Sequence, residues 1–403
     1  MSYPIAEVRG HFPALAEGAA HFDGPGGSQT PDVVADAVAG TLRAAVANRG
    51  PVTTAERRAD EIVARSRAAM ADLLHVDPRG VVFGRSMTQL TYDLARTLAK
   101  GWGPGDEVIV TRLDHDANIR PWVHAAEAVG ATIRWAPFDR VNGELDTAEI
   151  TGLLTERTRL VAVTGASNLL GSRPDAVTIA AAAHAAGALV HLDGVHLTPH
   201  ASVDVPALGV DFYACSPYKF LGPHLGALAA DPALLETLRP DKLLPADDDV
   251  PERFELGTLP YELLAGTEAA VDFLAGIMPG DGDRRARLVA SMAAVEAHEA
   301  VLLDRLEDGL AAIDGVTSHG DRDRHRTPTV LFSVAGRSSD AVYRQLAEYG
   351  VNAPAGSFYA LECSRWLGLG DDGAVRAGIA PYTDESDVDR LVAGVAKIAA
   401  NRT

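Results

Sequence analysis

The strongest constraint on the fold is an alternation of short β-branched runs with longer segments of helical periodicity. Apolar residues recur in the longer segments at a spacing near 3.6, which is typical of amphipathic helices. Strands separated by helices indicate βαβ units, whose strands run parallel and are covered on both faces. We therefore predict an α/β fold with a large, mainly parallel sheet. The expected strands are residues 81–83, 107–111, 131–135, 159–164, 188–192 and 212–215, and the helices between them include 87–100, 119–128 and 176–186.

The pattern changes after about residue 260, which indicates a second domain. A long charged amphipathic helix is expected over 284–312, a strand over 327–334, and helices near 339–349 and over 385–400. A chain of 403 residues is long enough for two or three domains. We expect an N-terminal arm (1–20), a large domain (21–262) and a smaller C-terminal α+β domain (263–403) that includes the long linking helix.

Charge and apolar patterning exclude several classes of protein. The formal net charge of −19 argues against broad binding to nucleic acid or anionic membranes. The most apolar stretch, 177–194, is interrupted by His184 and Gly187, so it predicts a helix and a strand but no membrane span. The N-terminus lacks a signal-peptide pattern. Cys215 and Cys363 are too few for a disulfide framework or a CxxC metal site, so we expect a cytoplasmic protein with reduced thiols and no metal.

An aspartate follows directly on one of the predicted buried strands. In the segment HLDGVH at 191–196, the strand ends in Asp193. Groups just beyond the carboxyl ends of strands line the ligand crevice of open α/β sheets. A carboxylate at this place can accept a hydrogen bond from a protonated ring nitrogen. The structural alternative is an aspartate that only begins the turn before Gly194.

The chain has four lysines, and one of them follows the next predicted strand. Lys219 comes after the apolar strand 212–215, in a loop with apolar neighbours and 26 residues beyond Asp193. Burial favours the neutral amine, which is the nucleophile in Schiff-base chemistry. The alternative is an ordinary surface lysine. Lys100 ends a helix, Lys242 lies in a loop and Lys397 lies in the last helix, so Lys219 is the best Schiff-base candidate.

Several segments together resemble one known family over nearly the whole chain. The chain is similar to the class V aminotransferases, which are fold-type I PLP-dependent transferases (PLP, pyridoxal 5′-phosphate), and within them to the cysteine-desulfurase-like branch. Each motif is weak alone, but their order and spacing are specific. The motifs are RLDHDAN at 112–118, ASNLLG at 166–171, HLDGVHLTPH at 191–200, SPYKFLGPH at 216–224 and FELGT at 254–258.

The resemblance implies roles around the cofactor ring. Lys219 would hold PLP covalently and move protons, and Asp193 would pair with the pyridinium nitrogen so that the ring acts as an electron sink. His115 would stack on the ring. Asn168 and His196 would lie near its phenolic oxygen, although family members often carry Gln in place of His196. Without the family context, both histidines could be satisfied core residues and Asn168 a turn residue.

The resemblance also implies a phosphate site and a substrate site. A helix is expected to begin near residues Ser86, Met87 and Thr88. Its free N–H groups and the positive end of its dipole favour a phosphate. Ser86 also fits an ordinary N-cap that forms a capping box with Gln89, which is compatible with phosphate binding. Ser216 would add a contact. Thr258 would reach the phosphate across the interface of a homodimer with shared active sites, and Arg376 would bind the carboxylate of an amino-acid substrate through two parallel hydrogen bonds.

The chain departs from the desulfurases at their nucleophile. Tyr359 stands where those enzymes place a mobile-loop cysteine, and Cys363 lies four residues further on, in an expected helix beside Glu362. A nucleophilic thiol needs exposure and a lowered pKa, and neither is evident for Cys363. Cys215 is expected in the core.

These residues favour one reaction and leave others open. We expect a PLP-dependent C–S β-lyase acting on cysteine or an S-substituted cysteine. The alternatives are a cysteine desulfurase that uses Cys363, or transamination, epimerisation or decarboxylation-linked oxidation. A dinucleotide-binding dehydrogenase is disfavoured because no G-x-G-x-x-G opens a helix after the first strand. A non-catalytic PLP-binding protein is disfavoured by the combination of Lys219, Asp193 and Arg376.

Overall fold

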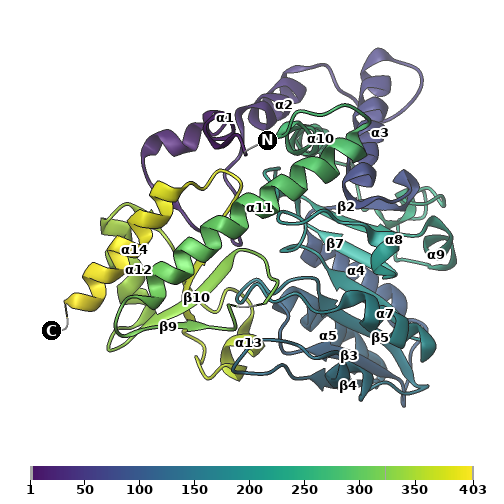
Figure 1. Ribbon diagram of the computed structural model, residues 1–403. Helices are drawn as coiled ribbons and strands as arrows, with labels where there is room; N and C mark the ends of the chain where they lie inside the picture. Colours follow the sequence, from purple (N-terminus) through teal and green to yellow (C-terminus); the bar gives the residue numbers. More distant parts are fainter. Residues whose placement is uncertain (1–2, 323, 402–403) are drawn as a thin grey trace.

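A computed structural model describes residues 3–322 and 324–401 and contains a seven-stranded sheet at its centre (Figure 1). Six strands are parallel, and β8 runs antiparallel to both of its neighbours. The predicted mainly parallel α/β fold is thus confirmed. In spatial order the strands are β2 (Val81–Gly84), β8 (Gly226–Ala230), β7 (Phe212–Cys215), β6 (Leu189–Asp193), β5 (Thr158–Thr164), β3 (Glu107–Thr111) and β4 (Thr132–Ala136).

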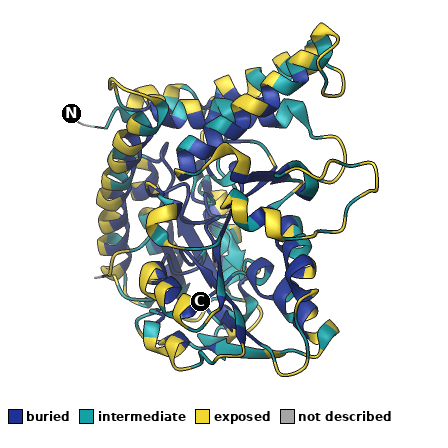
Figure 2. Ribbon diagram, turned by 90° about the vertical axis from the view of Figure 1, so that its right-hand side faces the viewer, coloured by how far each residue is buried: buried dark blue, intermediate teal, exposed yellow. Residues whose placement is uncertain are grey.

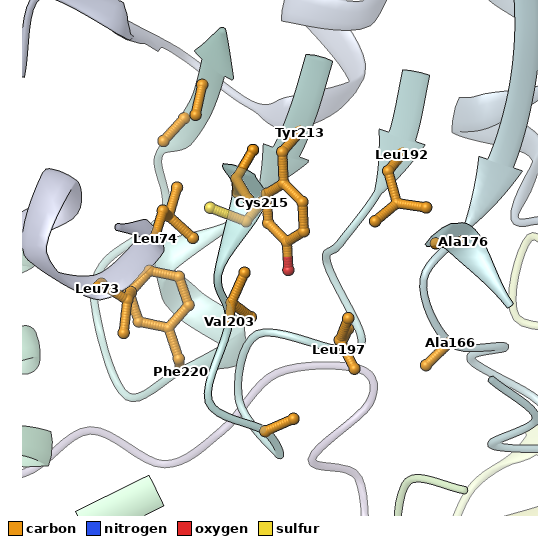
Figure 3. Packing of buried hydrophobic residues seen from close by; sticks show 14 of the residues in the cluster. Leu73, Leu74, Ala166, Ala176, Leu192, Leu197, Val203, Tyr213, Cys215 and Phe220 are labelled. Atoms are coloured by element: carbon orange, nitrogen blue, oxygen red, sulfur yellow. The ribbon is translucent and has the colours of Figure 1, made fainter. Parts of the chain in front are cut away.

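Alternate side chains of the strands enter two separate cores on the two faces of the sheet. On β7, Tyr213 and Cys215 join one core, whereas Phe212 and Ala214 join the other. Figure 3 shows Tyr213 and Cys215 within the first of these cores. Helices α3 (Thr54–Leu74) and α7 (Ala176–Ala185) cover that face, and α4 (Met87–Ala99) and α5 (Arg120–Val129) cover the opposite face. The strands are mostly buried between exposed helix surfaces (Figure 2), as expected for a sheet covered on both faces.

A smaller unit of the molecule is built on a four-stranded antiparallel sheet. Its order is β12 (Ala355–Gly356), β13 (Ala374–Gly378), β10 (Thr329–Val334) and β9 (Val316–His319). Helices α12 (Ser339–Glu348) and α14 (Glu385–Ala400) pack with it around a third core. The N-terminal strand β1 (Ala20–His21) pairs with β11 (Val351–Asn352), so the start of the chain is attached to this smaller unit.

The helix α11 (Arg284–Ala311) runs along both units (Figure 1). Its first half contributes Leu288 and Met292 to the large core, and its second half contributes Leu302 and Leu306 to the small core. The preceding helix α10 (Tyr261–Gly276) packs against α2 (Asp32–Arg43) and α3. We therefore propose a domain boundary within α11, in place of the expected boundary at residue 262.

The remaining elements are short and lie in the connections. In the part of the chain that the structure describes, no helix is long and apolar enough to cross a membrane. The short connecting elements are α1 (Ile5–Gly10), α6 (Thr147–Thr151), α8 (Val205–Leu208), α9 (Pro232–Thr237), α13 (Leu361–Trp366) and the 3₁₀ turns η1 (Pro13–Glu17), η2 (Pro78–Gly80), η3 (Asp116–Asn118), η4 (Pro217–Lys219) and η5 (Glu252–Phe254).

Candidate active site

A cavity of about 660 Å³ opens at the carboxyl ends of β5, β6 and β7 and is closed on one side by β13. The sequence predicted most of its polar lining, and the fold brings those residues together from segments far apart in the chain. The predicted residues that line it are Ser86, Met87, Thr88, His115, Asn168, Asp193, His196, Ser216, Lys219 and Arg376. Thr258 is the predicted residue that does not line it.

Lys219 ends the η4 turn that follows β7, and its amine faces the cavity. The Nζ atom donates a hydrogen bond to the backbone carbonyl of Pro25. Burial, followed by the positive charge of Arg376, lowers the pKa of Lys219 to about 7 against the opposing effects of Asp23 and Asp193. A large share of the amine is therefore neutral near pH 7, which is the form that acts as nucleophile or base.

Asp193 is the last residue of β6 and is almost fully buried, with 4% exposure. Its Oδ1 accepts a hydrogen bond from the Val195 backbone at 3.0 Å. Burial raises its pKa to about 6. The next residue must be glycine, because a Cβ on Gly194 would lie 2.0 Å from Cζ of Tyr213. This carboxylate is a buried acceptor suited to a cationic ring nitrogen.

His115 precedes the η3 turn and is held in its neutral form. Burial, followed by the charges of Lys219 and Arg376, lowers its pKa to about 3. Its Nδ1 accepts a hydrogen bond from the Ala117 backbone at 3.0 Å, so the ring proton lies on Nε2. Its ring centroid lies 5.6 Å from that of Tyr359 at the cavity rim.

Asn168 and His196 approach the cavity from the turns after β5 and β6. Asn168 donates from Nδ2 to the Phe358 carbonyl at 3.0 Å, while its Oδ1 is buried and has no hydrogen-bond partner among the described residues. Nε2 of His196 lies 3.0 Å from Oγ1 of Thr329 on β10. Each side chain thus connects the large sheet to the smaller unit.

The N-terminus of α4 forms the opposite end of the cavity. Ser86 accepts a hydrogen bond from the Gln89 backbone at 3.1 Å, but the Gln89 side chain donates to Asp93, so the expected capping box is only half formed. Within the described residues, the backbone N–H groups of Met87 and Thr88 have no acceptor. The helix end lies close to β8, because a Cβ on Gly226 would be 2.2 Å from the Ser86 carbonyl carbon. These free donors suit a phosphate.

Arg376 lies on β13, is 1% exposed and has a partner that the sequence did not indicate. Its Nη2 donates to Asp23 at 2.7 Å and its Nη1 to the Asn168 carbonyl at 3.2 Å. Nε is buried without a partner among the described residues, and the guanidinium lies 3.8 Å from the Phe358 ring centroid. Nε and Nη2 form one edge of the guanidinium. Asp23 therefore already occupies part of the edge that a substrate carboxylate would use.

Asp23 could have been suspected from the sequence. It is an acidic residue in a segment rich in Gly and Pro, FDGPGG at 22–27, where loops often carry function. Its pairing with Arg376 joins residues 353 positions apart, which no local pattern predicts. Arg120 also lines the cavity and binds Asp116 and Glu362.

The segment 357–366 gives the site no exposed thiol. Phe358 and Tyr359 have φ values of 50° and 59°, and Tyr359 is 78% exposed at the cavity rim. Cys363 lies in α13 as expected, fully buried, and burial raises its pKa. Cys215 is buried in β7, where burial raises its pKa to about 12.

Several contacts attach α13 to the large unit. Glu362 binds Arg120 at 2.6 Å and Arg112 at 3.1 Å. Trp366 donates from its indole nitrogen to the Phe138 carbonyl at 2.8 Å. The segment that follows the rim residues is therefore held against the start of α5 and against the connections that follow β3 and β4.

Thr258 lies at a separate surface depression of the same chain. Gly84, Arg85 and Leu256 also line this depression, close to the strand that leads to α4. The proposed role of Thr258 in a neighbouring subunit stays a prediction.

The site's donors and acceptors fit PLP. The free N–H groups of α4 and the hydroxyls of Ser86, Thr88 and Ser216 suit its phosphate, the buried Asp193 carboxylate suits its pyridinium, and Lys219 suits its aldehyde. In the described part of the chain, no group of three or more His, Cys, Asp or Glu could hold a metal ion. This fold and this site define a PLP-dependent enzyme of fold-type I.

The comparisons with known proteins give the family. The profile of the Aminotransferase class-V family matches residues 20–391, and the chain belongs to this family. It is 35% identical to an uncharacterised protein of Mycobacterium tuberculosis (99% of this chain, 100% of that one) and 32% identical to a cysteine desulfurase of Dickeya dadantii (98% and 97%). The crystal structure of a cysteine desulfurase from Escherichia coli superposes with a TM-score of 0.86 at 29% identity, covering 98% of each chain. The predicted family is thus confirmed.

Proposed function

We propose that this enzyme is a C–S β-lyase that acts on cysteine or an S-substituted cysteine. The observation that supports this proposal is the burial of both cysteine thiols. Cys363 is buried in α13 and Cys215 is buried in β7, and burial raises both pKa values, so neither is suited to attack a substrate sulfur. Elimination of the sulfur group needs no protein thiol.

The chain's own residues supply binding and proton transfer. PLP, when bound, supplies an electron sink for negative charge at Cα. Arg376 would bind the substrate carboxylate with the free Nε edge of its guanidinium, sharing that edge with Asp23. The neutral amine of Lys219 would take the Cα proton, and His115, neutral and protonated on Nε2, would cover the ring.

The proposed reaction balances with water as the co-reactant. The Cα proton passes to Lys219, the Cβ–S bond breaks, and sulfur leaves with the bonding electrons as a thiol after protonation. The three-carbon remainder takes up water and yields pyruvate and ammonia. We further propose a cytoplasmic homodimer whose active sites share Thr258.

The experiment is a screen of amino acids and S-conjugates of cysteine with simultaneous detection of pyruvate, sulfide or thiol, and keto acids. We expect pyruvate and the thiol in equal amounts. Keto acid that retains the substrate side chain would instead indicate transamination, and alanine with persulfide would indicate a desulfurase. Cys363→Ser should leave turnover within about twofold, and loss of turnover in this variant would support the desulfurase.

The lysine assignment has its own test. The purified protein should be yellow and should lose this colour on borohydride reduction, with the cofactor fixed to Lys219. In Lys219→Ala, the borohydride-sensitive colour and the elimination activity should both be lost. Persistence of that colour change in the variant would contradict the assignment.

A further inference from the structure

The cavity residue His196 is tied to the smaller unit through a single threonine. It follows β6 three residues after Asp193 and is 4% exposed. Its Nε2 lies 3.0 Å from Oγ1 of Thr329, while Nδ1 has no hydrogen-bond partner among the described residues. Because His196 lines the cavity, Nδ1 is the ring nitrogen left for a ligand there.

Thr329 is placed by the same pair of strands that places Arg376. It is the first residue of β10, is fully buried, and stands opposite Gly378 of β13, two residues beyond Arg376. Its backbone carbonyl accepts a hydrogen bond from Arg326 at 2.8 Å. The backbone of Thr329 is thus fixed by its pairing with β13 and by the hydrogen bond from Arg326. The position of its hydroxyl relative to His196 therefore depends on how the two units pack together.

The surroundings of His196 keep its imidazole neutral. Burial lowers its pKa, and the nearby His200, Arg376 and Lys219 side chains lower it further. His200 stands edge-on at 5.1 Å between ring centroids and binds Glu299 through Nδ1 at 2.9 Å. A neutral imidazole has one N–H donor and one acceptor, and the partner of one nitrogen decides which is which.

We propose that Thr329 is a positioning residue that selects the His196 tautomer. Its hydroxyl donates to Nε2, so the ring proton lies on Nδ1 and is directed to the cavity as a donor for the phenolic oxygen of PLP. This inference rests on the proposed cofactor role of His196. It adds a residue of the smaller unit to the machinery that holds the cofactor.

The test is a set of PLP titrations of the cofactor-depleted enzyme, followed by absorbance. Thr329→Val should weaken PLP binding about tenfold, the effect of one buried hydrogen bond. Thr329→Ser keeps the hydroxyl and should restore the affinity to within about threefold. Thr327→Val is the matched control, because Thr327 is an equally buried threonine two residues earlier whose hydroxyl bonds the Gly171 carbonyl instead. Its PLP affinity should stay within about twofold of wild type.

A double-mutant cycle separates positioning from loss of fold. In a His196→Ala background, Thr329→Val should change PLP affinity by less than about twofold, since the residue through which Thr329 acts is gone. An undiminished tenfold loss there would overturn the proposal. If Thr329→Val does not fold, nitrogen NMR of the ¹⁵N-histidine-labelled holoenzyme shows which ring nitrogen of His196 carries the proton. The signals of His196 are those that disappear in His196→Ala. Protonated Nδ1 supports the proposal and protonated Nε2 overturns it.

The same titrations keep this inference distinct from the proposed function. A protein that binds no PLP through Lys219 would contradict the proposed function itself. A protein that binds PLP through Lys219 with equal affinity in wild type and Thr329→Val would contradict only the role of Thr329.

Discussion

Asp193 is a carboxylic acid that the fold buries before any cofactor is present. Its pKa of about 6 lies above the ordinary aspartate value of 3.8, so the folded chain holds the proton more tightly than the unfolded chain. The protonated Asp193 therefore contributes to the free energy of unfolding. This contribution is fully present below pH 3.8 and is lost as the pH rises to about 6. Above pH 6 we therefore expect the ionised Asp193 to destabilise the cofactor-free protein by about 3 kcal/mol.

Asp193→Asn should therefore stabilise the cofactor-free protein while it weakens PLP binding. We expect the free energy of unfolding in urea to exceed that of wild type, by about 1–2 kcal/mol more at pH 8 than at pH 5. PLP affinity should fall at least tenfold, because the neutral amide no longer offsets the charge of a pyridinium. A stability difference that does not change with pH would show that Asp193 is not an ionised, buried group in the cofactor-free state.

At the scale of elements, α13 and the rim residues before it are held to the large unit by long-range contacts. Glu362 has 14% side-chain exposure and binds two arginines, so its charge is partly shielded from solvent. Glu362→Gln keeps the shape and removes that charge. We expect amide hydrogen exchange of residues 357–366 to become three- to tenfold faster, because local opening no longer breaks two ion pairs.

Glu348→Gln, an exposed change at the end of α12, is the matched control and should leave exchange of 357–366 unchanged. If Glu362→Gln also leaves it unchanged, then the Trp366 hydrogen bond and packing, and not the ion pairs, hold the segment.

The elements show how far local sequence patterns can predict this molecule. Strands β3 and β7 were predicted at their observed bounds, because β-branched and aromatic runs are local signals. Strand β8 was missed, since its sequence GALAA has no β-branched residue and its place depends on close contact with α4. Lys219 and Asp193 were found because each lies at or just beyond the end of a predicted strand. The contact of Glu362 with Arg112 joins residues 250 apart and depends on tertiary packing alone.

At the scale of the whole molecule, the question is whether one chain makes a complete site. The cavity contains the predicted residues except Thr258, which faces a separate depression with Leu256, itself 52% exposed. Glu255, three residues before Thr258, binds Arg67 and accepts a hydrogen bond from the Phe83 backbone at 2.8 Å. The segment that carries Thr258 is thus fixed to the strand that leads to the proposed phosphate-binding end of α4. We propose that a second copy of the chain uses Thr258 at its own phosphate site.

Mixed dimers give the decisive test of this arrangement. Thr258→Ala dimers should bind PLP about tenfold more weakly, through loss of a phosphate hydrogen bond, and Lys219→Ala dimers should be inactive. In a dimer of one Thr258→Ala chain and one Lys219→Ala chain, shared sites leave one site with both defects and one site with neither. Purified mixed dimers carrying two different tags should then show half of the wild-type activity, with wild-type PLP affinity at the intact site. If Thr258 served the site of its own chain, the site that retains Lys219 would also contain the Thr258→Ala substitution. The mixed dimer would then bind PLP no better than the Thr258→Ala dimer.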